Sequence, residues 1–155
     1  MDLYEGGIRE PLIARWPGRI PANTTSDVLS AQYDIMATFA AIAGVKAPAN
    51  DGISLLPALT GNPKAMQQRE YLYFEYPEKG GAVAIRTGDW KAIKTGMKKD
   101  RNAPWQLYNL ATDPGEQHDV AANHPAMLPR FDAIVAMEHR NAHLLEWEFI
   151  NNRKD

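Results

Sequence analysis

Near its start the chain reads YEGGIREP over residues 4–11, the most chemically specific segment of the sequence. Its adjacent glycines, Gly6-Gly7, permit positive φ angles and close backbone approach, which residues with a Cβ reach only at a cost. The pair predicts a tight turn, although Gly-Gly dipeptides are common in ordinary turns and so carry little specific information. Opposite charges, Glu5 and Arg9, flank this turn. The apolar run at 12–14 then predicts a short buried strand.

Composition limits the classes of protein that the chain can belong to. Its 155 residues are 45% hydrophobic and 23% charged, which is typical of a soluble globular protein of one domain or one and a half small ones. The net charge of −2 offers no basic surface for nucleic acid or for a membrane. Cysteine is absent, which excludes disulfides and thiolate metal sites and fits an extracytoplasmic bacterial protein and a cytosolic one equally. We expect neither nucleic acid nor a membrane as a partner.

The first half of the chain predicts helices after the opening strand. Asp34 is a candidate N-cap, and Gly44 stands where a helix would stop. Between them apolar residues recur at i, i+4, i+7 and i+8, at Ile35, Phe39, Ile42 and Ala43. This face is expected in a core. The segment DGISLLPALTG at 51–61 predicts a turn and a short helix, and a boundary follows near residue 65.

The second half predicts an antiparallel sheet of about four strands. Residues 71–76 and 105–110 are rich in aromatic and β-prone residues. The runs at 83–86 and 90–94 are separated by a short loop with glycine, which is typical of a hairpin. A C-terminal helix should cover this sheet and become regular only at Leu128, because proline is awkward in a helix interior. Its expected apolar stripe is Leu128, Phe131, Ile134, Val135, Leu144 and Leu145.

No nucleophile with its base, metal cluster or phosphate-binding loop stands out in the sequence. His139 and His143 are four residues apart, a zinc-ligand spacing only where a third ligand accompanies it. A solvated helix face is the favoured interpretation of the pair. His118 and His124 are interpreted as surface or capping residues. The basic loop at 98–101 is expected to be solvated, as short charge runs usually are.

Several segments resemble the sulfatases, the arylsulfatase-like sulfuric ester hydrolases of the alkaline-phosphatase-like superfamily, and they occur in the family's order. They are YEGGIREP at 4–11, WPG at 16–18, DGISLLP at 51–57, GDWK at 88–91 and DPGE at 113–116. The resemblance covers only the C-terminal part of such an enzyme. It implies an α+β fold in which residues 1–65 end the catalytic α/β domain as a strand and helices. Residues 66–155 would form the C-terminal subdomain, with its small sheet packed on the last helix.

The resemblance also implies a chemistry that this chain does not carry. Sulfatases use a formylglycine, made from Cys or Ser in a C/S-x-P-x-R motif, and a cation, usually Ca²⁺, held by Asp and Asn side chains. Neither the motif nor any cysteine occurs here. A sulfate-contacting lysine precedes the family's YEGG by a few residues and would fall ahead of Met1. The chain alone is therefore expected to be inactive, and a periplasmic or secreted parent enzyme is implied.

Two groups of residues are carried over as site candidates. Glu5, Gly6, Gly7 and Arg9 would lie under the active site and support it. The C-terminal strands and loops of the family form one wall of the substrate cleft. Residues on or beside the loop before the hairpin are therefore candidates for contacting a sulfated sugar or aryl group, namely Glu75, Lys79 and Arg86. Their alternative interpretation is an exposed loop with a structural arginine.

Two other functions remain open at this point. A phosphonate or phosphodiester hydrolase of the same superfamily would share these motifs and differ in its upstream nucleophile. A non-enzymatic module that binds sulfated glycans would need no nucleophile at all. Whichever of these functions applies, the front half of the isolated chain would expose apolar surface and a strand edge, which predicts self-association.

Overall fold

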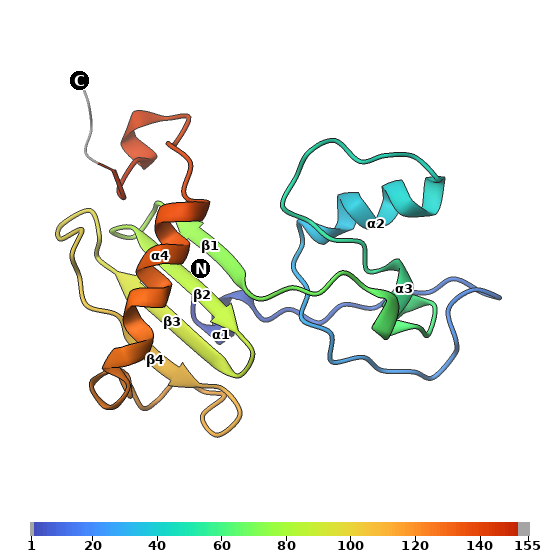
Figure 1. The fold of residues 1–155 in the computed structure, drawn as a ribbon, viewed down its shortest axis with the longest axis horizontal. Helices are drawn as coiled ribbons and strands as arrows, with labels where there is room; N and C mark the ends of the chain where they lie inside the picture. Colours follow the sequence, from blue (N-terminus) through green and yellow to red (C-terminus); the bar gives the residue numbers. More distant parts are fainter. Residues whose placement is uncertain (1, 152–155) are drawn as a thin grey trace. The chain divides into compact units, whose positions relative to one another are not determined.

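The computed structural model describes residues 2–151 and divides them into two compact units (Figure 1). Unit 1 combines the opening segment, up to Glu10, with the chain from Tyr71 onward, and unit 2 is Pro11–Glu70. The opening segment therefore folds with the second half of the sequence, across the 60 residues that separate them. The expected boundary between residues 65 and 66 separates two domains of the parent enzyme rather than these two units, and it stays a prediction.

Unit 1 is built on a four-stranded antiparallel sheet in the order β1-β2-β3-β4. Each strand pairs with its neighbour in sequence, as the predicted hairpin requires. Gly88 adopts a φ of 55° in the two-residue turn between β2 and β3, a conformation that favours glycine. The α+β prediction is confirmed. The strands are β1 Leu72–Tyr76, β2 Ala82–Thr87, β3 Trp90–Thr95 and β4 Gln106–Asn109.

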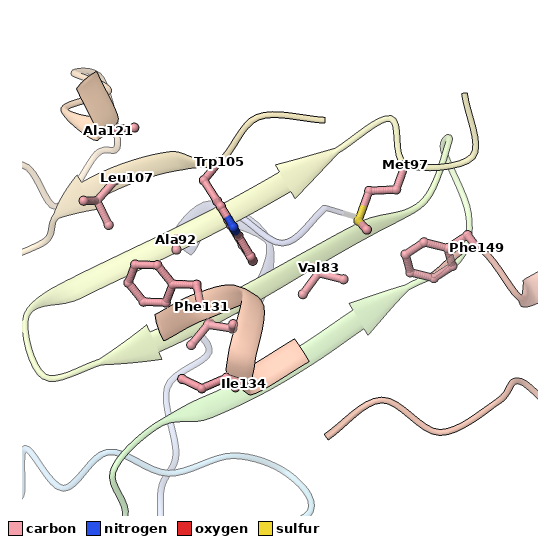
Figure 2. Packing of buried hydrophobic residues seen from close by; sticks show 10 residues of the cluster. Val83, Ala92, Met97, Trp105, Leu107, Ala121, Phe131, Ile134 and Phe149 are labelled. Atoms are coloured by element: carbon pink, nitrogen blue, oxygen red, sulfur yellow. The ribbon is translucent and has the colours of Figure 1, made fainter. Parts of the chain in front are cut away.

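The two faces of the sheet bury different parts of the chain, because side chains alternate along each strand. One face packs against α4, Leu128–Glu138, through a cluster that includes Val83, Ile85, Trp105 and Phe131 (Figure 2). The other face packs against the opening segment. That second cluster consists of Leu3, Ala84, Ile93 and Tyr108, with Tyr4 and Ile8 beside them.

The C-terminal helix begins where the sequence predicts, at Leu128 with proline in its first turn. It ends earlier than expected, at Glu138. Leu144 and Leu145 therefore do not continue its apolar stripe, and both are exposed, which corrects the prediction. The short 3₁₀ turns of unit 1 are η2 Ala121–Asn123, η3 Pro125–Met127 and η4 Leu145–Trp147.

Unit 2 contains α2 Asp34–Ala43, α3 Leu56–Leu59 and η1 Pro63–Ala65. Gly44 ends α2 in the left-handed conformation, as predicted. The strand expected at 12–14 does not form, and Ile13 is 91% exposed. The apolar face of α2 is not in a core either, since Phe39 is 65% exposed. The strand and the core position of this face were wrong, whereas these exposed residues agree with the expectation that the front half of the isolated chain exposes apolar surface.

Among the apolar residues of unit 2 only Leu55 and Met66 are buried, and several polar contacts connect its segments. Asp34 is fully buried and does not cap α2; instead it accepts the backbone N–H groups of Ala31 at 2.8 Å and Ile53 at 2.9 Å. Both its carboxylate oxygens also contact the guanidinium of Arg69. The hydroxyl of Thr38 accepts the N–H of Leu55 at 2.9 Å. Within residues 2–151 no helix has the length and apolarity to cross a membrane.

Candidate functional site

A buried charge cluster joins four side chains of unit 1: Glu5, Arg86, Lys91 and Glu116. Lys91 lies at its centre with a side chain that is 0% exposed. Its Nζ is 2.8 Å from Oε1 of Glu5 and 3.1 Å from Oε1 of Glu116. Two carboxylates thus face one ammonium group away from water.

Two further contacts complete the buried charge cluster. Nη1 of Arg86 donates to Oε2 of Glu5 at 3.2 Å. The backbone N–H of Glu5 donates to Oε2 of Glu116 at 2.5 Å. The cluster therefore holds two positive and two negative side chains, and a buried charge is tolerated when it is paired in this way.

The sheet register explains how the two basic residues meet. Arg86 on β2 and Lys91 on β3 are directly paired in the hairpin, so both project from the same face. That face is the one covered by the opening segment. Glu5 is the first residue of α1, Glu5–Ile8, and points its carboxylate at both bases.

Glu116 reaches the cluster from a loop with an unusual backbone. Its φ is 53°, in the left-handed region that residues other than glycine adopt at a cost. The preceding turn is fixed by Asp113, whose carboxylate accepts the N–H groups of Gln117 at 3.1 Å and His118 at 2.8 Å. These two hydrogen bonds lower the pKa of Asp113, so it stays ionised and keeps the loop in shape.

Aromatic contacts fix the opening segment beside the cluster. The hydroxyl of Tyr4 donates to Oε1 of Gln106 at 2.5 Å, and its ring lies edge-on to that of Tyr108. Burial, followed by the proximity of Tyr4, raises the pKa of Tyr108, which keeps this phenol neutral. The segment is thus held to the sheet by both charge and packing.

The Gly6-Gly7 pair does not form the positive-φ turn that its sequence favours. Both glycines lie in the single helical turn α1, and neither has a positive φ. Gly7 is needed for space: a Cβ there would lie 2.4 Å from the carbonyl oxygen of Asp2. A Cβ on Gly6 would meet nothing within 4 Å. Gly6 should therefore tolerate a larger residue better than Gly7.

We predict that Gly7→Ala lowers the free energy of unfolding of unit 1 by about 1–3 kcal/mol, because the methyl group forces α1 away from Asp2. Gly6→Ala is the matched control and should be neutral or slightly stabilising, since alanine favours helix. Hydrogen exchange of the β2 and β3 amides under native conditions measures both. Equal effects of the two substitutions would show that the close approach at Gly7 is unimportant.

The structure places the three predicted substrate contacts apart. Glu75 lies on the same face of β1 as Tyr73, the face that packs against α4, and its Oε1 accepts the hydroxyl of Tyr73 at 2.5 Å. Arg86 projects from the opposite face and belongs to the buried charge cluster, with its side chain 27% exposed. Lys79 is exposed in the β1–β2 turn at a φ of 48°.

The predicted supporting residues lie close together in α1 and its C-cap. Glu5 is in the buried charge cluster, and Arg9 is the exposed C-cap residue. Sequence reasoning missed Lys91 and Glu116 as site residues. Their positions could have identified them, because the GDWK and DPGE segments resemble the same family as YEGG does.

The histidine pair does not lie on a helix face, because α4 ends before it. His139 follows the last helical residue and is buried, with 5% of its side chain exposed, which corrects the expectation of a solvated face. His118 is largely exposed beside Asp113, whereas His124 packs edge-on against the ring of Trp90. Among residues 2–151 no three His, Asp or Glu side chains are placed to hold a metal ion.

Comparison with known proteins gives matches over most of the chain. Residues 2–136 match the family model for the C-terminal region of N-sulphoglucosamine sulphohydrolase. Arylsulfatase A from Homo sapiens is 36% identical over 137 residues, which covers 76% of this chain and 27% of that protein. N-acetylgalactosamine-6-O-sulfatase from Bacteroides thetaiotaomicron is 33% identical over 147 residues, which covers 86% of this chain and 28% of that protein.

One solved structure has a fold similar to that of this chain. It contains a protein in complex with its substrate D-glucosamine-2-N,6-O-disulfate, and it matches with a TM-score of 0.65 and 27% sequence identity. The match covers 79% of this chain and 26% of that chain. The chain therefore spans about a quarter of the length of the relatives it matches.

Proposed function

The chain belongs to the sulfatase family, and on that premise we propose that it is the C-terminal region of an enzyme that hydrolyses aryl or carbohydrate sulfate esters. In this proposal the nucleophile and the metal ligands belong to the rest of the enzyme. This region supports the active site from beneath and shapes one wall of the substrate cleft. The isolated chain is then inactive.

The observation that carries the proposal is the buried charge cluster. It joins Glu5 of YEGG, Lys91 of GDWK and Glu116 of DPGE, which are far apart in the sequence. The side chain of Lys91 has no exposed surface, so it is unsuited to touching a substrate. A role that fits is to fix the opening turn on the sheet. By the family resemblance, a sulfate-contacting lysine would lie a few residues before that turn and depend on its position.

Lys79 and Arg86 remain the proposed contacts for a sulfated substrate. Both carry positive charge, and both are at least partly exposed. A guanidinium suits a sulfate group because it offers several donors in one plane. Glu75 is a weaker candidate, since its Oε1 is already engaged by Tyr73 and lies 2.9 Å from a ring nitrogen of His139.

Among residues 2–151, the buried acidic side chains do not fit the calcium site that the family resemblance implies. The buried carboxylates of Glu5 and Glu116 are neutralised by Lys91 and Arg86 and have no surplus negative charge for a divalent ion. The described residues also offer no cluster of three suitable ligands. Since no Cys and no C/S-x-P-x-R pattern occurs in the sequence, the proposal assigns the formylglycine, and with it the cation, to another part of the enzyme.

Parallel assays of two polypeptides test this function. The isolated chain should release no sulfate from p-nitrophenyl sulfate or from a sulfated disaccharide, with or without added Ca²⁺. The chain extended by its upstream reading frame should hydrolyse at least one of them. Turnover by the isolated chain would refute the proposal. Hydrolysis of a phosphonate monoester alone by the extended protein would favour the related hydrolase, and glycan binding with no activity in either form would favour a binding module.

Self-association of the isolated chain is a separate expected result. Unit 2 exposes several large apolar residues, namely Leu12, Ile13, Met36, Phe39, Ile42 and Val45. Analytical ultracentrifugation should show a concentration-dependent dimer. Phe39→Glu should weaken it by about tenfold or more, equivalent to about 1.4 kcal/mol, whereas Leu145→Glu in unit 1 should not. A monomer at every concentration would contradict the expectation.

A further inference from the structure

We infer that the segment after α4, residues 140–151, is a positioning element that holds the β1–β2 turn and thereby sets the direction of Lys79. The inference rests on the proposed function, in which Lys79 contacts the sulfated substrate. It goes beyond that function because the match to the family model ends at residue 136, before this segment begins. The segment itself touches no substrate and acts through the turn.

The β1–β2 turn has a backbone conformation that needs support. Three consecutive residues, Lys79, Gly80 and Gly81, have φ angles of 48°, 93° and 77°. Glycine adopts this left-handed region freely, whereas lysine adopts it at a cost. The N–H of Gly81 closes the turn by donating to the carbonyl oxygen of Glu78 at 3.0 Å. Contacts from other segments must then keep the exposed Lys79 in this conformation.

The loop after β3 holds one side of the turn through backbone hydrogen bonds. The N–H of Lys98 donates to the carbonyl oxygen of Gly80 at 2.8 Å, and the N–H of Met97 donates to that of Gly81 at 3.2 Å. The ammonium group of Lys98 also donates to the carbonyl oxygen of Glu146 at 3.0 Å. This loop is therefore joined both to the turn and to residues 140–151.

Phe149 supports the turn directly from residues 140–151. Its side chain is buried in the hydrophobic cluster that packs against α4 (Figure 2). A Cβ on Gly81 would lie 2.9 Å from Cδ2 of the Phe149 ring, so the ring lies directly against the turn. A Cβ on Gly80 would come no closer than 3.7 Å to any atom. The positive φ thus favours glycine at both positions, whereas the ring restricts only Gly81.

Glu148 fixes the part of the chain that carries Phe149. Its carboxylate accepts the backbone N–H groups of Ala142 at 3.0 Å, Ile150 at 3.0 Å and Asn151 at 2.8 Å. Burial raises the pKa of Glu148, but these hydrogen bonds act the other way and the net pKa is lowered, so the carboxylate stays ionised. The two ends of the segment are thereby tied to the residue that precedes Phe149.

These contacts form a continuous path from Glu148 through Phe149 and Gly81 to Lys79. Without the Phe149 ring, the turn would keep only its backbone hydrogen bonds, and Lys79 would sample other directions. Substrate binding should then weaken while the chemical step is unchanged, because the proposed function assigns the nucleophile and the cation to another part of the enzyme.

Hydrogen exchange of this chain tests whether the segment holds the turn. Phe149→Ala should lower the protection of the Met97 and Lys98 amides, which donate to the turn, by about tenfold or more. Trp147→Ala is the matched control, because Trp147 is an aromatic residue of the same segment that is 45% exposed, and it should leave both amides unchanged. Equal effects of the two substitutions, or unchanged protection in Phe149→Ala, would overturn the inference.

A second pair of variants decides the question if Phe149→Ala fails to fold. Gly81→Ala places a methyl group against the Phe149 ring, whereas Gly80→Ala does not, although both glycines have a positive φ. Gly81→Ala should therefore lower the protection of the amides that donate to Glu148 about tenfold more than Gly80→Ala does. Equal effects at these amides would overturn the inference.

Kinetics of the enzyme extended by its upstream reading frame test the positioning role. Phe149→Ala should raise KM for a sulfated disaccharide about tenfold and leave kcat unchanged, as expected when a charged hydrogen bond to the substrate is lost. Lys79→Ala should have the same effect, and the double variant should be no worse than either, because both act through one contact. Phe149→Leu, which keeps much of the apolar volume, should recover most of the loss.

The possible failures of this kinetic test are distinguishable. An unchanged KM in Phe149→Ala, or additive effects of the two substitutions, would overturn the positioning role in an enzyme that is otherwise active. An unaltered extended protein that hydrolyses no sulfate ester would instead refute the proposed function. Hydrogen exchange would still decide whether residues 140–151 hold the turn.

Discussion

Lys91→Met should lower the free energy of unfolding of unit 1 by about 3–5 kcal/mol, because it leaves two buried carboxylates without their shared cation. Methionine preserves most of the volume of the side chain, so the loss is that of charge rather than packing. Glu5 would keep its contact with Arg86, but the two carboxylates, whose side chains are only 7% and 3% exposed, would then repel each other. Urea denaturation, with hydrogen exchange of β2 and β3 as the local probe, measures the loss.

Lys94→Met is the matched control because it makes the same change on the same strand. Nζ of Lys94 is 2.8 Å from Oδ1 of Asp132, whose side chain is 57% exposed. Asp132 is solvated, but only 13% of the Lys94 side chain is exposed and its Nζ lies 4.6 Å from the centre of the Trp105 ring. This substitution should therefore cost about 1–2 kcal/mol, less than Lys91→Met. If Lys91→Met prevents folding, Glu116→Gln keeps the shape of the site and should give a smaller loss of the same sign. Equal losses at Lys91 and Lys94 would mean that the buried charge cluster does not hold unit 1 together.

Asp34→Ala should have a comparable effect on unit 2, about 3–5 kcal/mol, because it strips Arg69 of its buried partner. The substitution also leaves the backbone N–H groups of Ala31 and Ile53 without an acceptor. Unit 2 has no large apolar core to compensate, so its helix α2 should lose most of its protection from hydrogen exchange.

Asp51→Ala provides the control for this prediction, since Asp51 is an exposed aspartate of the same unit. Its removal should change the protection of α2 by an amount within about 0.5 kcal/mol. Protection of α2 that survives Asp34→Ala unchanged would show that the polar contacts are not what stabilises unit 2. Unit 1 serves as an internal reference in both variants.

Local patterns predicted much of the fold, because they reflect local chemistry. The hairpin could be predicted from two β-prone runs around Gly88, and the start of α4 from the proline that follows Leu128. The apolar periodicity alone placed Phe39 in a core, and only the family resemblance predicted exposed apolar surface in this half of the isolated chain. An apolar helix face indicates that something covers it, but not whether the covering element belongs to the same chain.

The buried charge cluster could be predicted only in part, because its residues lie far apart in the sequence. Glu5 stood out because it adjoins a distinctive glycine pair. Its partners Lys91 and Glu116 lie 86 and 111 residues away, and no periodicity in one sequence links residues at such distances. The pairing of His139 was hidden as well, since a four-residue histidine spacing suggests a helix that in the structure has already ended.

Sequencing the coding DNA immediately upstream of codon 1 tests most directly whether this chain is the C-terminal region of a sulfatase. We predict an open reading frame that encodes a lysine a few residues before Tyr4 and, further upstream, Cys or Ser in the pattern C/S-x-P-x-R. An in-frame stop codon directly upstream would contradict this assignment and would leave a free-standing module in which the buried charge cluster serves stability alone.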